Sequence, residues 1–533
     1  MSEKKEKCFL IVSGMIFALA FFGFILFINA RIDFLLNSDD SSELVLGRLL
    51  ASENRLLSKN WYYSTELRVV NTQIFYAFFF KLFQNWHTVR IASYICLYIV
   101  MIAAYYFMCK ALTIKKYFLI TAALLMIPFS EDYFSVVLKG AYYIPHIAIT
   151  FFTLGFSETC IEMTNGKREK ICVFAAFLCA ILAGMGGARQ VVVLYFPLAL
   201  AAMCIIALGL SVDEGKIICV LNPEDRKYIR FSFISFAGAL IGYVINTRIL
   251  SKIFTFEQWD SICFQGFDVY KLQQVVNGFL TSYGYKTEKV FSTALLCNFI
   301  CLCWLVLTLT ACLYILKNRK RVTPSHFRLA LFTVAAFATF IILYVFTDLG
   351  YGNRYNLPII ILSIPMIAVL FKNTKLQSSV NYALLTLFVL LVLCAGGLRC
   401  RDKCRVDYTA ELRGIVAALQ NEQYTEGYTT LWRGNVLTEL SNGVIDVRVW
   451  QESEPYQHIT VDSIDDTNKW LQLVAHDYTR PEGKVFLLFT TTEWENNPWK
   501  GKLSTDNVIY HSGEYMVIGY ESYDKLLKDT TQQ

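Results

Sequence analysis

Residues 8–28, CFLIVSGMIFALAFFGFILFI, contain no charged side chain and follow the lysine-rich segment EKKEK at residues 3–7. An α-helix needs about 20 apolar residues to cross a bilayer, whereas the apolar part of a signal peptide has roughly 7–15. The sequence therefore predicts that the chain begins with a membrane-spanning helix that is not cleaved.

Long apolar runs of this kind continue, between short polar loops, up to about residue 398. A single strand in lipid would leave its backbone polar groups without hydrogen bonds, so we expect every span to be a helix. The further spans are expected at residues 91–109, 114–129, 143–163, 171–188, 191–210, 229–249, 291–316, 329–346, 357–371 and 382–398.

Composition divides the chain into two parts. Of its 533 residues, 55% are hydrophobic and 17% are charged, while a soluble globular protein carries about 25% charged residues. We therefore expect a polytopic all-α membrane domain at residues 1–398, with about 11 transmembrane helices, and a small external α/β domain of about 130 residues at 399–533. Strands are expected there at residues 428–432, 444–450, 484–490 and 516–521, and helices at 407–420 and 467–476.

The charges of the loops predict the orientation. Lysine and arginine gather at residues 110–116, 167–170, 226–227, 317–321 and 372–375, in alternate loops that share a side with the N-terminus. Acidic residues mark the intervening loops: Asp39, Asp40, Glu131, Asp132, Asp260, Asp268 and Asp348. Since positive loops stay cytoplasmic, we expect a multi-pass plasma-membrane protein with a cytoplasmic N-terminus and an extracellular C-terminal domain.

Two kinds of partner are excluded by the pattern of charged and cysteine residues. No basic stripe interleaved with aromatic residues occurs, so nucleic acid is not an expected partner. Most of the 16 cysteines, such as Cys172, Cys297 and Cys301, lie in apolar runs, where they are expected to act as small apolar residues. No structural metal site is expected. Cys400 and Cys404 lie just beyond the last span, either as a disulfide or as two free thiols.

The first external loop is the most informative stretch, NSDDSSE at residues 37–43. A carboxylate of Asp39 or Asp40 can act as a general base on an acceptor hydroxyl, or hold a divalent ion such as Mg²⁺ or Mn²⁺ against a phosphate. A purely structural alternative is that Asp40 caps a helix and Glu43 completes a capping box. The apolar segment 74–83 is too short to cross and predicts an interfacial helix.

Two arginines are expected on the side where cations are scarce. Arg189 lies in GGARQ at residues 186–190, and Arg354 in GNRYNLP at residues 352–358. The guanidinium fork suits phosphate, although contact with lipid headgroups is the alternative at both positions. Glu131, Asp132 and His146 lie in or beside the next external loop, where solvated charge or simple packing is the competing interpretation.

The sequence lacks a Walker-type phosphate loop, GxSxG and HExxH. This argues against an ATP-driven transporter and favours a donor that is already activated as a lipid.

These features resemble the GT-C superfamily, the integral-membrane glycosyltransferases that use polyprenyl-phosphate sugars. Relatives in this superfamily include protein O-mannosyltransferases and lipid A aminoarabinose transferases. Asp39 and Asp40 match the superfamily's acidic position after the first span. The segment 74–83 with WHTVR at residues 86–90 looks like its short helix and following arginine. Arg354-Tyr355 before Pro358 looks like its late arginine-tyrosine-proline signature.

The sequence departs from the superfamily pattern in two places. TELR stands at residues 65–68 where a lysine followed by two prolines is common, and YIP stands at residues 143–145 where an aspartate often precedes a proline. Donor, acceptor and second acid therefore stay open, and Glu131, Asp132, His146 and Arg90 are candidates for a second acid or acceptor contact.

The resemblance implies an inverting glycosyltransferase that moves a sugar from a polyprenyl phosphate to an extracytoplasmic glycan, lipid or protein. Asp39 or Asp40 would be the base or hold the metal, and Arg354, Tyr355 and Arg189 would bind the donor phosphate. The alternatives are a transporter of lipid-linked sugars or a non-catalytic membrane protein that binds wall polymers. Polar residues gather at the outer ends of the spans and no internal repeat is found, which favours the enzyme over the transporter.

Overall fold

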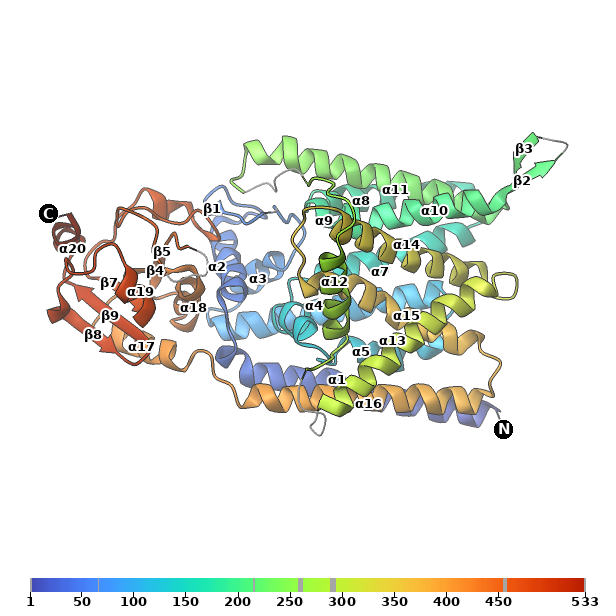
Figure 1. Ribbon diagram of the computed structural model, residues 1–533, viewed down its shortest axis with the longest axis horizontal. Coiled ribbons are helices and arrows are strands. Elements are labelled where there is room, and N and C mark those ends of the chain that lie inside the picture. The colour runs from blue at the N-terminus through green and yellow to red at the C-terminus, as the bar shows by residue number, and fades with distance from the viewer. Residues whose placement is uncertain are drawn as a thin grey trace.

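The computed structural model describes residues 2–65, 67–213, 216–256, 262–287, 294–453 and 458–531. Asp260, expected in an external loop, and Glu66 of the TELR segment lie outside these residues. A large helical domain carries a smaller sheet-containing C-terminal domain at one end, and the N-terminus lies at the opposite end (Figure 1).

Within the described residues, nine helices are long and apolar enough to cross a membrane. This confirms a polytopic helical domain followed by a small α/β domain. The helices are α1 (Ser2–Arg31), α4 (Trp86–Ala111), α7 (Ile144–Glu162), α10 (Phe196–Gly209, preceded by α9, Ala188–Gln190, and the π-helix η4, Val191–Tyr195), α11 (Pro223–Arg248), α13 (Ala294–Lys317), α14 (Pro324–Phe346), α15 (Leu357–Asn373) and α16 (Ser378–Cys404).

The other two expected spans form helices of a different kind. Helix α5 (Phe118–Leu125) has only 8 residues, because Pro128 disfavours a helical residue before it. The chain continues from α5 as a non-helical segment in which Met126, Ile127 and Phe129 are buried; irregular backbone is tolerated at membrane depth where protein covers it. Helix α8 (Gly166–Gly184) begins with four charged residues, then exposes an apolar stripe suited to lipid.

Helix α2 (Ser38–Glu53) begins three residues earlier than the capping hypothesis requires. Its N-cap is Asn37, whose side chain accepts a hydrogen bond from the Asp40 N–H. The proposed Asp40 cap is therefore wrong, and Glu43 instead accepts hydrogen bonds from Arg68 and Thr72. Since capping uses neither aspartate side chain, both carboxylates are available for other contacts.

Helix α3 (Gln73–Phe80) confirms the expected short helix at residues 74–83. The remaining short elements of the helical domain are η1 (Ile32–Phe34), β1 (Trp61–Tyr62), η2 (Lys115–Tyr117), α6 (Glu131–Tyr133), the π-helix η3 (Phe134–Lys139), β2 (Leu210–Asp213), β3 (Lys216–Cys219), η5 (Leu250–Lys252), α12 (Val269–Ser282) and η6 (Asn353–Asn356). Helix α12 runs across the direction of the long helices (Figure 1).

The C-terminal domain is built on a five-stranded sheet with the order β5-β4-β7-β9-β8. Strands β5, β4 and β7 are parallel, and β9 and β8 continue the sheet antiparallel. The elements of this domain are α17 (Ala410–Asn421), β4 (Glu426–Thr430), α18 (Leu431–Leu440), β5 (Asp446–Trp450), β6 (Gln472–Leu473), η7 (Val474–Asp477), β7 (Val485–Thr490), α19 (Thr491–Asn496), η8 (Thr505–Asn507), β8 (Val508–His511), β9 (Tyr515–Tyr520) and α20 (Tyr523–Thr531).

The four expected strands correspond to β4, β5, β7 and β9, and the first expected helix to α17. The helix expected at residues 467–476 is wrong: that segment contributes β6 and the start of η7. The reason is tertiary, because β6 pairs antiparallel with β1 of the helical domain. Strand β8 and helices α18 and α20 were not expected from the sequence.

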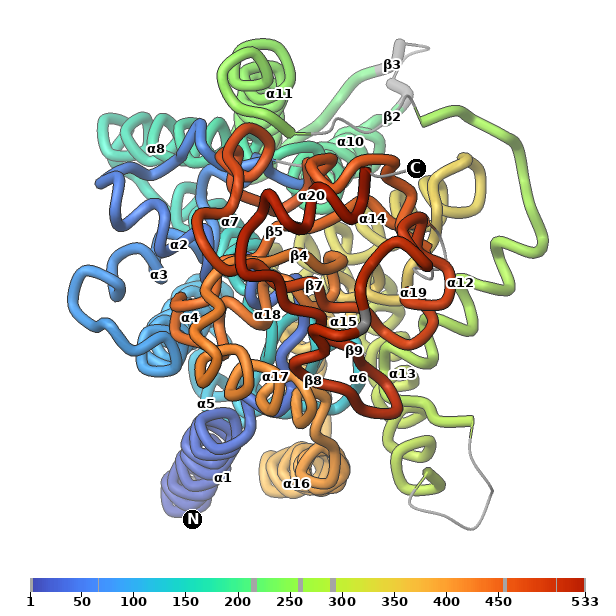
Figure 2. Tube along the Cα trace, turned by 90° about the vertical axis from the view of Figure 1, so that its left-hand side faces the viewer, coloured from blue at the N-terminus to red at the C-terminus, as the bar shows by residue number. Residues whose placement is uncertain are grey.

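The C-terminal domain rests on the segment that follows the first span. Viewed from its end of the molecule, it covers the centre of the helix bundle, while α1 and α16 emerge together at the edge (Figure 2). Besides the β1–β6 pair, the backbone N–H of Trp86 donates to the Asn442 side chain at 3.1 Å, and the Tyr62 hydroxyl donates to Asp477 at 3.1 Å.

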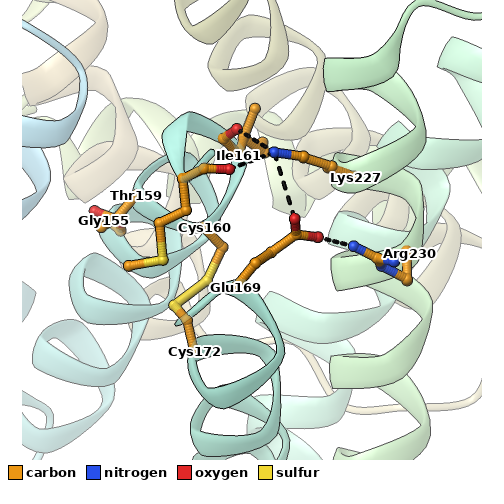
Figure 3. Close-up of a disulfide and its surroundings, with 9 residues drawn as sticks. Gly155, Thr159, Cys160, Ile161, Glu169, Cys172, Lys227 and Arg230 are labelled. Atoms are coloured by element: carbon orange, nitrogen blue, oxygen red, sulfur yellow. Dashed lines mark hydrogen bonds and ion pairs between the residues drawn. A yellow bond between two sulfur atoms is a disulfide. The ribbon is translucent and has the colours of Figure 1, made fainter. Parts of the chain in front are cut away.

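A disulfide lies at the end of the helical domain opposite the C-terminal domain. Cys160 of α7 and Cys172 of α8 are bonded across the α7–α8 turn, beside Glu169 and its partners Lys227 and Arg230 of α11 (Figure 3). The expectation that Cys172 acts as a small apolar residue is wrong, because the turn brings its Cα within 6.1 Å of that of Cys160. Cys297, Cys301, Cys400 and Cys404 are free thiols.

Candidate functional site

A cavity of about 400 Å³ opens between helices α7, α11, α14 and α15 near the end that carries the C-terminal domain. Its walls are mostly apolar, with Val192, Phe340 and Leu343 among them. The charged residues that line it, within the described part of the chain, are Arg189 and Arg354, and no aspartate or glutamate joins them. An apolar cavity with two cations at its wall fits an anionic group attached to a hydrocarbon chain.

Local structure explains how Arg354 reaches this cavity. It lies in η6, directly before α15, which has Pro358 in its first turn. The Arg354 guanidinium lies 5.5 Å from the centre of the Tyr355 ring, and that ring stacks on Tyr344 at 5.3 Å. Tyr355 lines the cavity too, so the expected pair Arg354-Tyr355 is placed at its wall by aromatic packing.

Arg189 approaches the same cavity from the short helix α9. Gly187, directly before α9, has a φ of 101°, a backbone conformation that would be strained in a residue with a side chain. Glycine at this position therefore allows the sharp turn from α8 into α9. The Arg189 guanidinium lies 5.0 Å from the centre of the Tyr143 ring. Tyr143 therefore holds one arginine of the site as Tyr355 holds the other.

His146 lines the cavity beside Arg189. Its Nδ1 lies 2.9 Å from the Gln190 side-chain nitrogen, while its buried Nε2 has no hydrogen-bond partner among the described residues. A histidine in this position has one ring nitrogen available to a ligand, so His146 fits a polar contact inside an otherwise apolar cavity.

Asp39 lies in the first turn of α2 and is half-buried. Burial and the neighbouring Asp40 raise the pKa of its carboxyl group, while the charges of Arg354, Arg68 and Lys139 act in the opposite direction. The charge of the late arginine therefore acts on the acidic segment, although the sequence separates the two by more than half the chain.

Asp40 has a different environment from Asp39. It is buried, and one of its carboxylate oxygens forms an ion pair with the buried Lys139, which also donates to the Leu35 carbonyl at 3.1 Å. The other oxygen, Oδ1, has no hydrogen-bond partner in the described ranges. Asp40 therefore has a fixed cationic partner, while Asp39 is the more accessible carboxylate of the pair.

Arg90 lies apart from the cavity, at the junction with the C-terminal domain. It is fully buried, and its Nε and Nη2 donate to the two carboxylate oxygens of Glu439 at 2.7 and 2.5 Å. Glu439 belongs to α18, 349 residues further along the chain. No sequence signal identified this partner, because nothing local to either residue marks the pair.

Glu131 and Asp132 lie in the short helix α6 and differ in their partners. Burial alone would raise the pKa of Glu131, but ion pairs with Lys403 and Arg399 outweigh it and lower the pKa. Burial and the charge of Glu131 raise the pKa of Asp132, against the opposing charges of Arg399 and Arg354. Among the charges that act on Asp132 is that of Arg354 of the cavity.

A divalent ion does not fit the donor set around Asp39 and Asp40. Asp40 is already paired with Lys139, and the described ranges contain no group of three or more histidine, cysteine, aspartate and glutamate side chains arranged to hold a metal. Mg²⁺ and Ca²⁺ sites in proteins are built from several oxygen ligands. Among the described residues, Asp39 and Asp40 therefore lack the further ligands that the expected divalent ion would need.

A second cavity, of about 760 Å³, lies at the junction between α2 and α18. Arg48, Gln84, Asn85, Asn442 and Asp446 give it a polar lining. The first cavity is the more apolar of the two, so it is the better fit for a lipid-linked ligand.

Comparisons with known proteins gave structural neighbours but no sequence relatives. No family model matches the chain, and no curated protein matches it. The structural neighbours include two structures of the Archaeoglobus fulgidus oligosaccharyltransferase, a GT-C superfamily enzyme. One is a complex with Zn and sulfate, with 11% sequence identity and a TM-score of 0.46, covering 90% of this chain and 67% of that chain.

The other was tethered to an acceptor peptide containing the NVT sequon, with 10% identity and a TM-score of 0.45. It covers 83% of this chain and 64% of that chain, so this chain spans slightly less than two thirds of it. At these low TM-scores, the function proposed below rests on the residues of this chain.

Proposed function

We propose that this chain is an inverting membrane glycosyltransferase of the GT-C type, which transfers a sugar from a polyprenyl phosphate to an acceptor outside the cytoplasm. The observation that carries the proposal is the cavity with Arg189 and Arg354 at its wall, together with the charge interaction between Arg354 and Asp39. An apolar chain fits the cavity, its phosphate fits the arginines, and Asp39, whose pKa the charge of Arg354 lowers, supplies the carboxylate.

The two arginines are proposed to stabilise the leaving group. As the bond between the anomeric carbon and the phosphate oxygen breaks, its electron pair goes to the oxygen and negative charge builds on the polyprenyl phosphate. Cations fixed beside that oxygen stabilise the charge where it develops. Tyr143 and Tyr355 hold the guanidinium groups against their rings, so little reorganisation is needed during the reaction.

Asp39 is proposed as the general base. It takes the proton of an acceptor hydroxyl as the acceptor oxygen bonds to the anomeric carbon on the face opposite the phosphate, which inverts that carbon. A pKa raised by burial brings a carboxylate closer to the proton affinity that base catalysis needs. Asp40, paired with Lys139, is proposed to hold the start of α2, and Asp132 is the candidate for a second acid.

The proposed orientation follows the loop charges, with the N-terminus in the cytoplasm and the C-terminal domain outside a plasma membrane. The acceptor is proposed to be a cell-surface glycan, a lipid or a protein.

The proposal is tested with purified protein in nanodiscs, supplied with polyprenyl phosphates that carry radiolabelled sugars and with acceptors of each class. We expect label to move to one acceptor class, with release of polyprenyl phosphate. Retention of all label on the lipid, together with movement of labelled lipid across the bilayer of proteoliposomes, would show a transporter instead.

A further inference from the structure

Glu439 of the C-terminal domain is connected to the acidic helix α2 through one arginine. Its side chain is buried, and its only cationic partner among the described residues is Arg90 of α4. Arg90 donates at the same time to the backbone carbonyl of Asp40, at 3.0 Å. One guanidinium group therefore joins a carboxylate of the C-terminal domain to the peptide unit that follows Asp40.

The contacts of Arg90 continue to the side chain of Asp40. Its Nη1 donates to the Tyr94 hydroxyl at 2.8 Å, and that hydroxyl donates to the Lys139 carbonyl. The Lys139 ammonium group is the ion-pair partner of Asp40. The helix start is thus held at its backbone by Arg90 directly and at its side chain through Tyr94 and Lys139.

We propose that Glu439 is a positioning residue: through Arg90 it fixes the first turn of α2, and with it Asp39, in the position that transfer requires. This inference rests on the proposed function for the role of Asp39. The C-terminal domain then acts on the site across the domain junction, since a carboxylate of α18 sets the position of Arg90.

The physical reason is that Arg90 has no other carboxylate partner among the described residues. A fully buried cation must be paired, and both oxygens of Glu439 provide that pairing. Without the carboxylate, Arg90 has to move toward water or another acceptor, and its bond to the Asp40 carbonyl is lost. The first turn of α2 then gains freedom, although the core of the helix stays packed.

The test compares Glu439→Gln with Glu426→Gln in the full chain in nanodiscs. Glu426 is a matched control because it pairs with the buried Arg448 in the same domain at 2.9 Å, away from α2. The first measurement is amide hydrogen exchange of residues 38–44. We expect faster exchange there in Glu439→Gln and wild-type exchange in Glu426→Gln, and unchanged exchange in Glu439→Gln would overturn the inference.

The second measurement is the kinetics of sugar transfer. In Glu439→Gln we expect kcat to fall about tenfold, because a reacting group is displaced, while the KM for the lipid donor stays within about twofold. A loss that lies in the donor KM alone contradicts a positioning role. If the wild-type protein transfers no sugar, the proposed function fails, while hydrogen exchange still decides whether Glu439 holds α2.

Tyr94→Phe covers the case in which Glu439→Gln does not fold. It removes one hydrogen-bond partner of Arg90 and keeps the ring in place. We expect a smaller rise in exchange over the same residues, and no rise in this variant overturns the inference.

Discussion

Two buried arginine–glutamate pairs lie at opposite ends of the helical domain. At the end near the C-terminal domain, Arg90 of α4 pairs with Glu439 of α18. At the end near the N-terminus, Arg328 of α14 pairs with Glu158 of α7, and its Nε and Nη2 donate to the two carboxylate oxygens at 3.0 and 2.5 Å. The pairs are almost identical as local chemistry, and both joined residues are buried in each case.

They differ in what else the guanidinium group contacts. Arg90 also bonds to Tyr94 and to the Asp40 carbonyl, whereas Arg328 Nη1 has no hydrogen bond among the described residues and lies 3.7 and 3.9 Å from Glu224 and Asp225. A buried ion pair by itself joins helices. The pair near the C-terminal domain also contacts α2, the helix that carries the proposed base Asp39.

Among substitutions at the two ends, Asp39→Asn is expected to cause the largest loss of sugar transfer. This change removes the proposed base with little change in shape, and general base catalysis is worth about 10²–10⁴-fold, so we expect a loss of about 10³-fold in kcat. The measurement is transfer of labelled sugar under saturating donor. The control is Asp402→Asn, which changes another carboxylate near this end that pairs with Lys286 and Arg401; it should leave the rate unchanged. Equal rates for Asp39→Asn and wild type would show that Asp39 is not the base.

A smaller loss is expected from Arg354→Ala. Removing one donor that stabilises developing charge costs about 10²–10³-fold, so we expect about 10²-fold in kcat. Arg354→Lys should recover only part of it, since an ammonium group lacks the planar fork. Full recovery by lysine would show that charge alone is needed and that the stacking on Tyr355 has no role.

The pH dependence separates the electrostatics of Asp39 from its position. Burial and Asp40 raise the pKa of Asp39 above the ordinary value of about 3.9. The base works when deprotonated, so kcat/KM should fall as the pH drops through that raised pKa. Arg354 opposes the rise, so Arg354→Ala should move the acidic limb to higher pH. A limb that moves to lower pH, or does not move, contradicts the interaction between these two residues.

The smallest effect on transfer is expected from Glu158→Gln at the opposite end. Breaking the buried pair leaves Arg328 with only the more distant carboxylates of Glu224 and Asp225, and breaking a buried pair costs about 3–5 kcal/mol of stability. We expect a lower midpoint of thermal unfolding but an unchanged rate for each folded molecule. If Glu158→Gln lowers kcat as much as Glu439→Gln does, contact with α2 is not what distinguishes the two pairs.

Much of the fold is predictable from local patterns. Apolar runs and the short segment at residues 74–83 predicted the long helices and α3, and β-branched runs predicted β4, β5, β7 and β9. Some failures have local causes, since Pro128 shortens α5 and Asn37 caps α2, and others come from tertiary contacts. The segment 467–476 pairs with β1 instead of forming a helix, and Cys172 meets Cys160 across a turn.

The sequence indicated candidate residues for the site, but it did not indicate which side chains pair with one another. Asp39 was a candidate because an acidic pair follows the first span, and Arg189 and Arg354 were candidates because cations are scarce in the expected external loops. Which aspartate of the pair is accessible depends on Lys139, and the place of Arg90 depends on Glu439, far along the chain. The apolar cavity is a product of several helices packing together, so no single segment indicates it.

The central claim is that the cavity with Arg189 and Arg354 holds a lipid phosphate. The most direct test is native mass spectrometry of the wild-type protein and Arg189→Ala/Arg354→Ala with polyprenyl phosphate and with the matching polyprenol. We expect the wild type to retain polyprenyl phosphate at least tenfold more strongly than polyprenol, and the double variant to lose that preference. Equal retention of the two lipids by the wild-type protein would contradict the account.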